Sequence, residues 1–245
     1  MEHLAEGLRP DARFPGSGAR LSAVRARTAI IAVVLMVALA VSACGGDAGP
    51  RRILLVGDSV MNQTAGPLAH DLPDDDVRNE SVFGSGLLTA GYVDWPAQLG
   101  RLLDHYRPDV VVFLFVGNYE FSDDESDLYT TADGHRIETR TDPAFFRAWQ
   151  AQAQRMTDAA SEVADDVIWV LPPPMQFEEA DTVADGLRIG YEHLDTTTVD
   201  AADVLADDEG NYLASDGDTL LRSDGVHLTP EGARRLAQLI ADQLD

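Results

Sequence analysis

Two groups of residues, far apart in the sequence, have the types and the spacing that nucleophilic catalysis needs. Gly57-Asp58-Ser59 follows an apolar run at residues 53–56, and Asp224 lies three residues before His227. At that spacing one turn of chain can place a carboxylate beside an imidazole, which fixes the tautomer and stabilises the imidazolium. No other histidine of the chain has an acid three residues before it. A serine, a histidine and an aspartate that meet in the fold could attack an acyl group.

Ser59 taken alone also has an ordinary structural interpretation. Glycine, aspartate and serine are the usual residues of a strand-to-helix turn, where a serine caps the helix. The segment after His227 has helix-start residues too, with Thr229 as cap, Pro230 at the first helical position and Glu231 in the first turn. We therefore expect the histidine on a loop directly before a helix.

The elements that must position these residues alternate along the chain. Apolar or β-branched runs predict strands at residues 53–56, 77–83, 109–116 and 167–171, and helical stretches are predicted at 59–70, 95–106, 143–164, 182–194 and 230–244. This alternation predicts an α/β fold, a three-layer α/β/α sandwich with a mostly parallel sheet. Residues 120–142 are predicted to be a polar insertion loop, and residues 207–218 to be rich in turns.

Two further segments fall at predicted strand ends, where parallel sheets bind their ligands. Residues 79–86, "NESVFGSG", place glycines after the second strand, where a backbone amide can approach a ligand closely. Residues 116–119, "VGNY", end the strongest strand, so the side-chain amide of Asn118 is expected at the same rim. Each could be a plain turn, but together with Ser59 and His227 they fit one site.

These motifs together resemble those of the SGNH hydrolase superfamily, the GDSL-like lipases and esterases. The matching residues are Gly57-Asp58-Ser59, Asn79 with Gly84, Gly117-Asn118, and Asp224 to His227, and the resemblance spans residues 52–245. It implies a flavodoxin-like fold and serine-dependent chemistry on acyl esters. By motif matching it implies that Ser59 is the nucleophile, His227 the general base and Asp224 its orienting acid.

The resemblance also implies an oxyanion hole made by the Ser59 amide, Gly84 and the Asn118 side chain. Gly86 competes with Gly84 for the second place. The third motif departs from the family pattern, because Val116 stands where a glycine is usual and Tyr119 where an aspartate is usual. The departure leaves the role of Asn118 intact and puts the shape of the neighbouring pocket in question.

Composition excludes several other functions. Asp and Glu number 42 against 18 Lys and Arg, a net charge of -24, which disfavours nucleic-acid binding. All the basic residues are arginines, so mechanisms that need a lysine amine, such as a P-loop or a Schiff base, are excluded. No His/Cys cluster suggests zinc. The sequence predicts an enzyme with no metal and no cofactor.

The N-terminal segment predicts export. Residues 29–43 are apolar or small, follow three arginines and precede Cys44, the only cysteine. At about 1.5 Å per residue this run is too short for a bilayer core of roughly 30 Å, so a secretory signal fits better than a permanent membrane helix. Residues 41–44, "VSAC", resemble a bacterial lipobox, which implies lipidation of Cys44. A cysteine buried in a signal anchor is the alternative, and translation could begin near Val24.

The predicted organisation is a lipoprotein signal peptide at 1–43, a tether at 44–51 and a hydrolase domain at 52–245. We expect an exported serine esterase, lipid-anchored at the outer face of the cytoplasmic membrane, that removes acyl groups such as acetyl from envelope carbohydrate or lipid. One alternative is an acyltransferase with the same Ser-His-Asp triad. Another is a non-hydrolytic envelope binding protein that uses the 120–142 loop.

Overall fold

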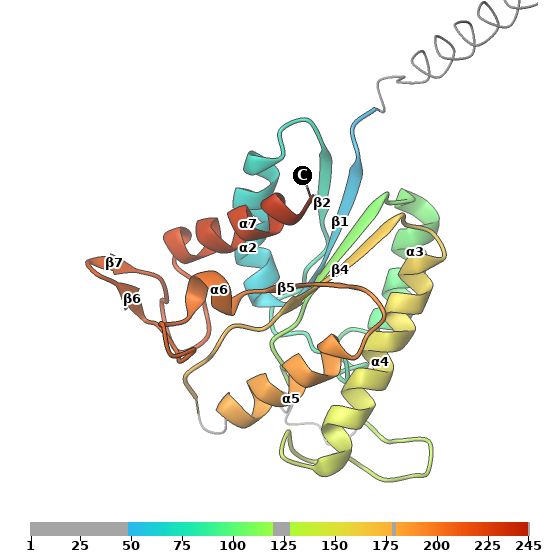
Figure 1. Cartoon of the computed structure of the whole chain (residues 1–245). Coiled ribbons are helices and arrows are strands. Elements are labelled where there is room, and N and C mark those ends of the chain that lie inside the picture. Colours follow the sequence, from blue (N-terminus) through green and yellow to red (C-terminus); the bar gives the residue numbers. More distant parts are fainter. Residues whose placement is uncertain (1–48, 120–127, 178–179, 245) are drawn as a thin grey trace, which may run out of the picture. The chain divides into compact units, whose positions relative to one another are not determined.

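A five-stranded parallel sheet lies at the centre of the computed structural model, which describes residues 49–119, 128–177 and 180–244. The strand order is β2-β1-β3-β4-β5 (Figure 1). The strands are β1 (Arg52–Gly57), β2 (Asp76–Asn79), β3 (Val110–Leu114), β4 (Asp166–Leu171) and β5 (Thr197–Asp200). Because the order reverses beside β1, the sheet has a switch point at the carboxyl end of β1, where α/β sheets form ligand sites.

Helices cover both faces of this sheet (Figure 1). One face carries α2 (Ser59–Asp71) and α7 (Pro230–Leu244), with the short α6 (Ala202–Leu205) beside α7. The other face carries α3 (Trp95–Tyr106), α4 (Pro143–Ser161) and α5 (Ala180–Glu192). A small antiparallel hairpin, β6 (Ser215–Asp216) and β7 (Thr219–Leu220), precedes α7. The predicted three-layer α/β/α sandwich is confirmed.

The apolar runs form strands because both of their faces are buried. All five residues of β3 are buried, and they alternate between two cores. Val110, Val112 and Leu114 pack against the α2 and α7 side, whereas Val111 and Phe113 face α3 and α4. A strand buried on both faces needs an unbroken apolar sequence, which is why residues 110–114 lack the polar alternation of a half-exposed strand.

The structure differs from the sequence prediction at the two edges of the sheet. The strand predicted at 77–83 ends at Asn79, whose side-chain oxygen accepts a hydrogen bond from the Ser81 amide at 3.0 Å and starts a turn. Strand β5 was not predicted, because its sequence, TTVD, is short and only partly buried. The strand predicted at 109–116 is β3, trimmed to 110–114.

Two predicted segments lie wholly or partly outside the described residues. These are the leader at 1–43 with Cys44, and residues 120–127 of the insertion. The described part of the insertion contains an antiparallel bridge between Thr130 and Arg136. Among the residues that the structure describes, no helix is long and apolar enough to cross a membrane.

Candidate active site

The turn from β1 into α2 holds Ser59 as the first helical residue. The helix cap is Asp58, whose Oδ1 accepts a hydrogen bond from the Val60 amide at 3.0 Å. The cap interpretation of Ser59 is therefore wrong, because the capping oxygen comes from the residue before it. The Ser59 hydroxyl is therefore not the capping group, and it lies against the loop that carries His227.

Ser59, His227 and Asp224 form a continuous hydrogen-bonded chain. His227 Nε2 lies 3.0 Å from Ser59 Oγ, and His227 Nδ1 lies 2.8 Å from Asp224 Oδ2. With Nδ1 protonated and donating to Asp224, Nε2 is the acceptor for the serine hydroxyl. The structure thus brings Ser59 together with Asp224 and His227, which lie 165 and 168 positions further along the sequence, in an arrangement suited to general-base activation of a hydroxyl.

The loop that carries His227 is fixed by its own backbone. Asp224 Oδ1 accepts hydrogen bonds from the amides of Val226 and His227, each at 2.7 Å. Burial alone would raise the pKa of Asp224, but these amides and the His227 ring lower it to about 2. The carboxylate therefore stays ionised throughout the neutral range and can stabilise a histidine cation.

Helix α2 holds the same loop from the other side. The side-chain amide of Gln63 accepts a hydrogen bond from the Leu228 amide at 2.9 Å and donates one to the Leu228 carbonyl at 3.2 Å. Since Ser59 and Gln63 lie one helical turn apart, a single helix positions both the serine and the residue next to His227. Thr229 caps α7 as predicted, and its Oγ1 accepts from the Gly232 amide at 3.2 Å.

Asp58 connects this turn to the end of β3. It is fully buried, and its Oδ2 accepts a hydrogen bond from the Val116 amide at 2.7 Å. Burial raises the pKa of Asp58 to about 7, although the bonds from Val116 and Val60 oppose the rise. The sequence marked Asp58 only as part of a motif, and its second bond could not be foreseen because it crosses between strands.

Gly84 and Gly86 differ in their surroundings. The Gly86 amide donates to Thr89 Oγ1 at 3.0 Å, so it is already engaged. A Cβ at Gly86 would lie 1.9 Å from the Asn118 carbonyl oxygen, so this glycine allows two loops to touch. Gly84 has a φ of +72° and nothing within 4 Å of an added Cβ, so it stays the candidate for the second oxyanion amide that the motif implies.

Asn118 keeps one amide hydrogen for a ligand. Its Nδ2 donates to the Ser85 carbonyl at 3.1 Å, which orients the group and uses one of its two hydrogens. Tyr119, at the unusual position of the third motif, is 1% exposed and donates its hydroxyl to the Ile137 carbonyl at 2.7 Å. The altered motif therefore supports the 128–142 segment through Tyr119, and it leaves Asn118 at the rim.

A pocket of about 510 Å³ opens beside the chain of hydrogen bonds. Its lining includes Asn118, His227 and three residues that the sequence did not single out, Arg140, Gln176 and Phe177. The Arg140 guanidinium lies 4.8 Å from the centre of the Phe177 ring. These residues come from segments that meet only in three dimensions, so no local pattern could have identified them. On another side of His227, the half-exposed ring of Phe83 stacks on the imidazole at a centroid distance of 6.0 Å.

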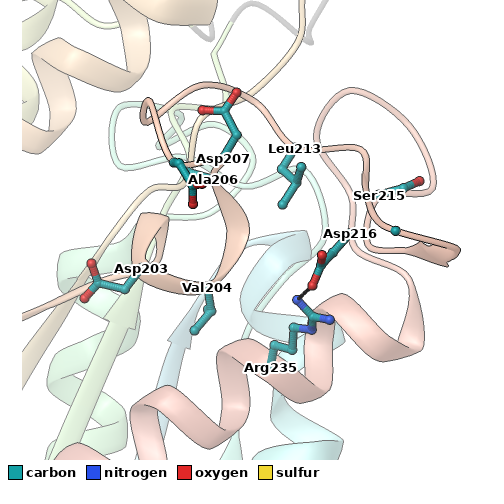
Figure 2. Close-up of a pocket in the computed structure, with 10 residues that line it drawn as sticks. Asp203, Val204, Ala206, Asp207, Leu213, Ser215, Asp216 and Arg235 are labelled. Atoms are coloured by element: carbon teal, nitrogen blue, oxygen red, sulfur yellow. Dashed lines mark hydrogen bonds and ion pairs between the residues drawn. The ribbon is translucent and has the colours of Figure 1, made fainter.

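A separate hollow of about 510 Å³ lies between α6, the β6–β7 hairpin and α7 (Figure 2). Its lining is acidic, and the one arginine in it, Arg235, is paired with Asp216 at 2.8 Å. None of Ser59, Asp224 and His227 lines it. Over residues 49–119, 128–177 and 180–244, no group of three His, Cys, Asp or Glu side chains is arranged to hold a metal ion.

Solved structures share this fold at low sequence identity. A GDSL-like lipase from Bacteroides thetaiotaomicron is 13% identical, with 79% of this chain and 87% of that one covered and a TM-score of 0.52. A catalytic mutant of an acetylxylan esterase from Geobacillus stearothermophilus is 15% identical, with 81% and 96% covered and a TM-score of 0.52. The periplasmic domain of a lipopolysaccharide acetyltransferase from Salmonella ser. Paratyphi A is 13% identical, with 80% and 84% covered and a TM-score of 0.55.

The chain therefore has the fold of the SGNH, or GDSL-like, hydrolases. Residues 52–243 match the family model described as "Protein of unknown function (DUF459)", and the chain belongs to that family. A comparison with curated protein sequences found no match.

Proposed function

We propose that this protein is a metal-independent serine esterase that removes acyl groups, acetyl among them, from carbohydrate or lipid of the cell envelope. The observation that carries the proposal is the chain of hydrogen bonds from Asp224 through His227 to Ser59, with lengths of 2.8 and 3.0 Å. It ends beside a pocket that His227 and Asn118 help to line. The base and a polar amide thus line one cavity, and the nucleophile lies 3.0 Å from the base at its edge, an arrangement suited to acyl transfer.

In the acylation step, Ser59 Oγ attacks the ester carbonyl carbon while His227 Nε2 takes the hydroxyl proton. The negative charge that develops on the carbonyl oxygen is met by the Ser59 amide, the Gly84 amide and the free hydrogen of Asn118 Nδ2. Collapse of the tetrahedral intermediate breaks the bond to the alcohol oxygen. The histidine cation, stabilised by ionised Asp224, gives its proton to the departing alkoxide.

In the deacylation step, water replaces the alcohol. His227 takes a proton from the water as its oxygen attacks the acyl-serine carbonyl carbon, and the same three donors stabilise the second oxyanion. The ester bond to Ser59 then breaks, and the proton on His227 returns to Ser59 Oγ. The carboxylic acid product leaves, and the enzyme is restored.

Labelling with a fluorophosphonate tests this proposal directly. The reagent should form a stable adduct with the wild-type protein and none with Ser59→Ala, whose turnover of p-nitrophenyl acetate should fall by at least about 10³-fold because the nucleophile is gone. Ser215→Ala, which changes a serine in the hollow of Figure 2, should label like the wild type. Equal labelling of the wild type and Ser59→Ala would overturn the assignment.

An acyltransferase is the second candidate, because a sugar hydroxyl can replace water in the deacylation step without any change in the triad. The fold shared with a lipopolysaccharide acetyltransferase domain favours keeping this candidate. Product analysis from an acetyl donor, with and without a glycan acceptor, separates the two. Acetylated glycan would indicate transfer, and free acetate at the same rate in both reactions would indicate hydrolysis.

The third candidate is a non-hydrolytic binding protein, and the altered third motif is the one feature of the sequence that favours it. Tyr119 at that position is buried and hydrogen-bonded to the Ile137 carbonyl, so the alteration is explained by support of the 128–142 segment. Nothing in the altered motif then favours loss of catalysis over its retention.

A further inference from the structure

Another cavity, the second hollow, lies directly beside the candidate active-site pocket and is distinct from the hollow of Figure 2. Its volume is about 790 Å³, within the range of small-molecule sites, and it lies among α5, the start of α6 and residues 210–212. Met175, Gln176 and Phe177 line both cavities. These three residues form a partition between the cavities, and the Gln176 side chain on it is exposed.

The partition is fixed to the loop that carries His227. The backbone amide of Gln176 donates to the Gly225 carbonyl at 2.7 Å, and a Cβ at Gly225 would lie 1.9 Å from the backbone carbonyl oxygen of Gln176. The buried guanidinium of Arg222 donates to the carbonyls of Pro174 and Val226, each at 3.0 Å. The partition is therefore held at a set position relative to the His227 loop.

The floor of the second hollow is polar but carries few unpaired charges. Arg188 makes a two-pronged pair with Asp200, at 2.6 and 2.5 Å, and also donates to the Pro172 carbonyl at 3.3 Å. Burial alone would raise the pKa of Asp200, but the bonds from Arg188 and from the Ala202 amide keep it below its ordinary value. Since this arginine is satisfied by a carboxylate of the protein, the hollow is not suited to a phosphate or carboxylate ligand.

The remaining lining suits a ligand with many hydroxyl groups. Asn211 and Gln176 line the hollow with side-chain amides, of which the Asn211 amide donates one hydrogen to Asp207 at 3.2 Å, and Asp185 presents an exposed carboxylate. Tyr212 and Phe177 contribute aromatic rings, each also approached by an arginine guanidinium, at 5.6 and 4.8 Å from the ring centre. An acyl chain placed there would remove water from these polar groups and return no hydrogen bonds, which is costly. A sugar ring offers hydroxyls to the amides and carboxylate and C–H faces to the aromatic rings.

We propose that this second hollow is a subsite for a neighbouring sugar unit of the substrate, so that the enzyme acts on acyl esters of oligosaccharides or polysaccharides. The inference rests on the proposed function, because it takes Ser59 as the point where the ester is cleaved. The acylated unit lies in the pocket lined by Asn118 and His227, and the next unit crosses the partition at Gln176 into the hollow lined by Asn211 and Asp185. Tyr212 ties the subsite to the triad, since its hydroxyl donates to the Asp224 carbonyl at 2.8 Å.

The test compares kcat/KM on O-acetylated xylose, xylobiose and xylotriose and on the corresponding acetylated glucose and N-acetylglucosamine series, for the full mature chain. In at least one series, kcat/KM should rise about tenfold from the acetylated monosaccharide to the disaccharide or trisaccharide. In Asp185→Ala and Asn211→Ala the ratio of kcat/KM for the longer substrate to that for the monosaccharide should fall toward one. The matched control is Asp203→Ala, which removes an exposed carboxylate lining the other hollow (Figure 2) and should keep the full rise.

The outcomes separate this inference from the proposed function. Ser59-dependent turnover of p-nitrophenyl acetate with no rise along any series overturns the subsite alone. An equal effect of Asp185→Ala and Asp203→Ala on the rise also overturns it. If turnover does not depend on Ser59, the proposed function fails, and calorimetric titration of Ser59→Ala with the unacetylated trisaccharides still tests the hollow. No binding of any trisaccharide there would overturn the subsite as well.

Discussion

Asp58 joins the two backbone segments that carry the proposed nucleophile and the proposed oxyanion side chain. One carboxylate oxygen accepts the Val60 amide at the start of α2, and the other accepts the Val116 amide two residues before Asn118. A neutral amide at this position could accept only one of the two bonds and would turn its NH₂ group toward the other donor. The two carboxyl oxygens of Asp58 thus help to set the distance between Ser59 and Asn118.

That arrangement predicts a pH dependence of stability. In the unfolded chain Asp58 titrates near its ordinary value of 3.8, whereas burial raises its pKa to about 7 in the folded protein. Between about pH 4 and 7 the folded state therefore binds more protons than the unfolded state, and the contribution of Asp58 to the free energy of unfolding falls as pH rises. Urea unfolding across this pH range should show that the free energy of unfolding falls less steeply with pH, or rises, in Asp58→Asn compared with the wild type.

Asp224 should contribute a pH dependence of stability with the opposite sign, and it serves as the comparison for Asp58. Its pKa is lowered to about 2 in the folded protein, so its stabilising contribution is present above about pH 4 and is lost as pH falls toward 2. Asp224→Asn should therefore lose less stability than the wild type below pH 4. Identical pH profiles for the wild type and Asp58→Asn would contradict the raised pKa of Asp58.

At the scale of elements, the loop after β2 and the end of β3 are packed so closely that a methyl group cannot fit between them. A Cβ at Gly86 would lie 1.9 Å from the Asn118 backbone oxygen, and neither backbone can move without disturbing the other. We expect Gly86→Ala to displace Asn118 and to lower kcat on p-nitrophenyl acetate by about 10²-fold, the cost of losing one oxyanion donor.

Gly100→Ala is the matched control for this prediction. Gly100 lies in α3, exposed, with nothing within 4 Å of a Cβ, so alanine should raise stability by about 0.5–1 kcal/mol and leave kcat unchanged. Equal kinetics for the two alanine variants would show that the contact at Gly86 does not position Asn118.

The sequence predicted the central elements better than the edges. Strands β1, β3 and β4 are buried on both faces, and their unbroken apolar runs identify them. Strands β2 and β5 lie at the edges with four residues each and partial burial, so tertiary pairing rather than local pattern determines them. For the same reason, the Asp224–His227 spacing was visible in the sequence, whereas Gln176 and Arg140 were not.

For the whole molecule, we propose that the leader directs export and anchoring at the membrane. Removing residues 1–43 would take away five arginines and three acids, leaving the mature chain even more acidic. A diacylglyceryl group on Cys44 would hold this domain at the membrane through the tether at 44–51, because an acylated cysteine partitions into lipid.

Expression in a bacterial host tests the anchor. Wild-type protein and Ser59→Ala should both sediment with the membrane fraction, whereas Cys44→Ala should lose the lipid and leave that fraction. Because Cys44 is the only cysteine, no disulfide is disturbed by the change. Retention of Cys44→Ala in the membranes would instead favour a signal anchor that stays in the chain.

The clamp between Gln63 and Leu228 has a consequence for the timing of activity. Ser59 and Asn118 lie in the first half of the chain, but the base arrives with the final segment, which is held against α2 by the Gln63 side chain and by the packing of α7. A chain in which α7 has not yet folded against α2 holds Ser59 without its proposed base. We therefore predict that the proposed esterase activity begins only after α7 has packed against α2.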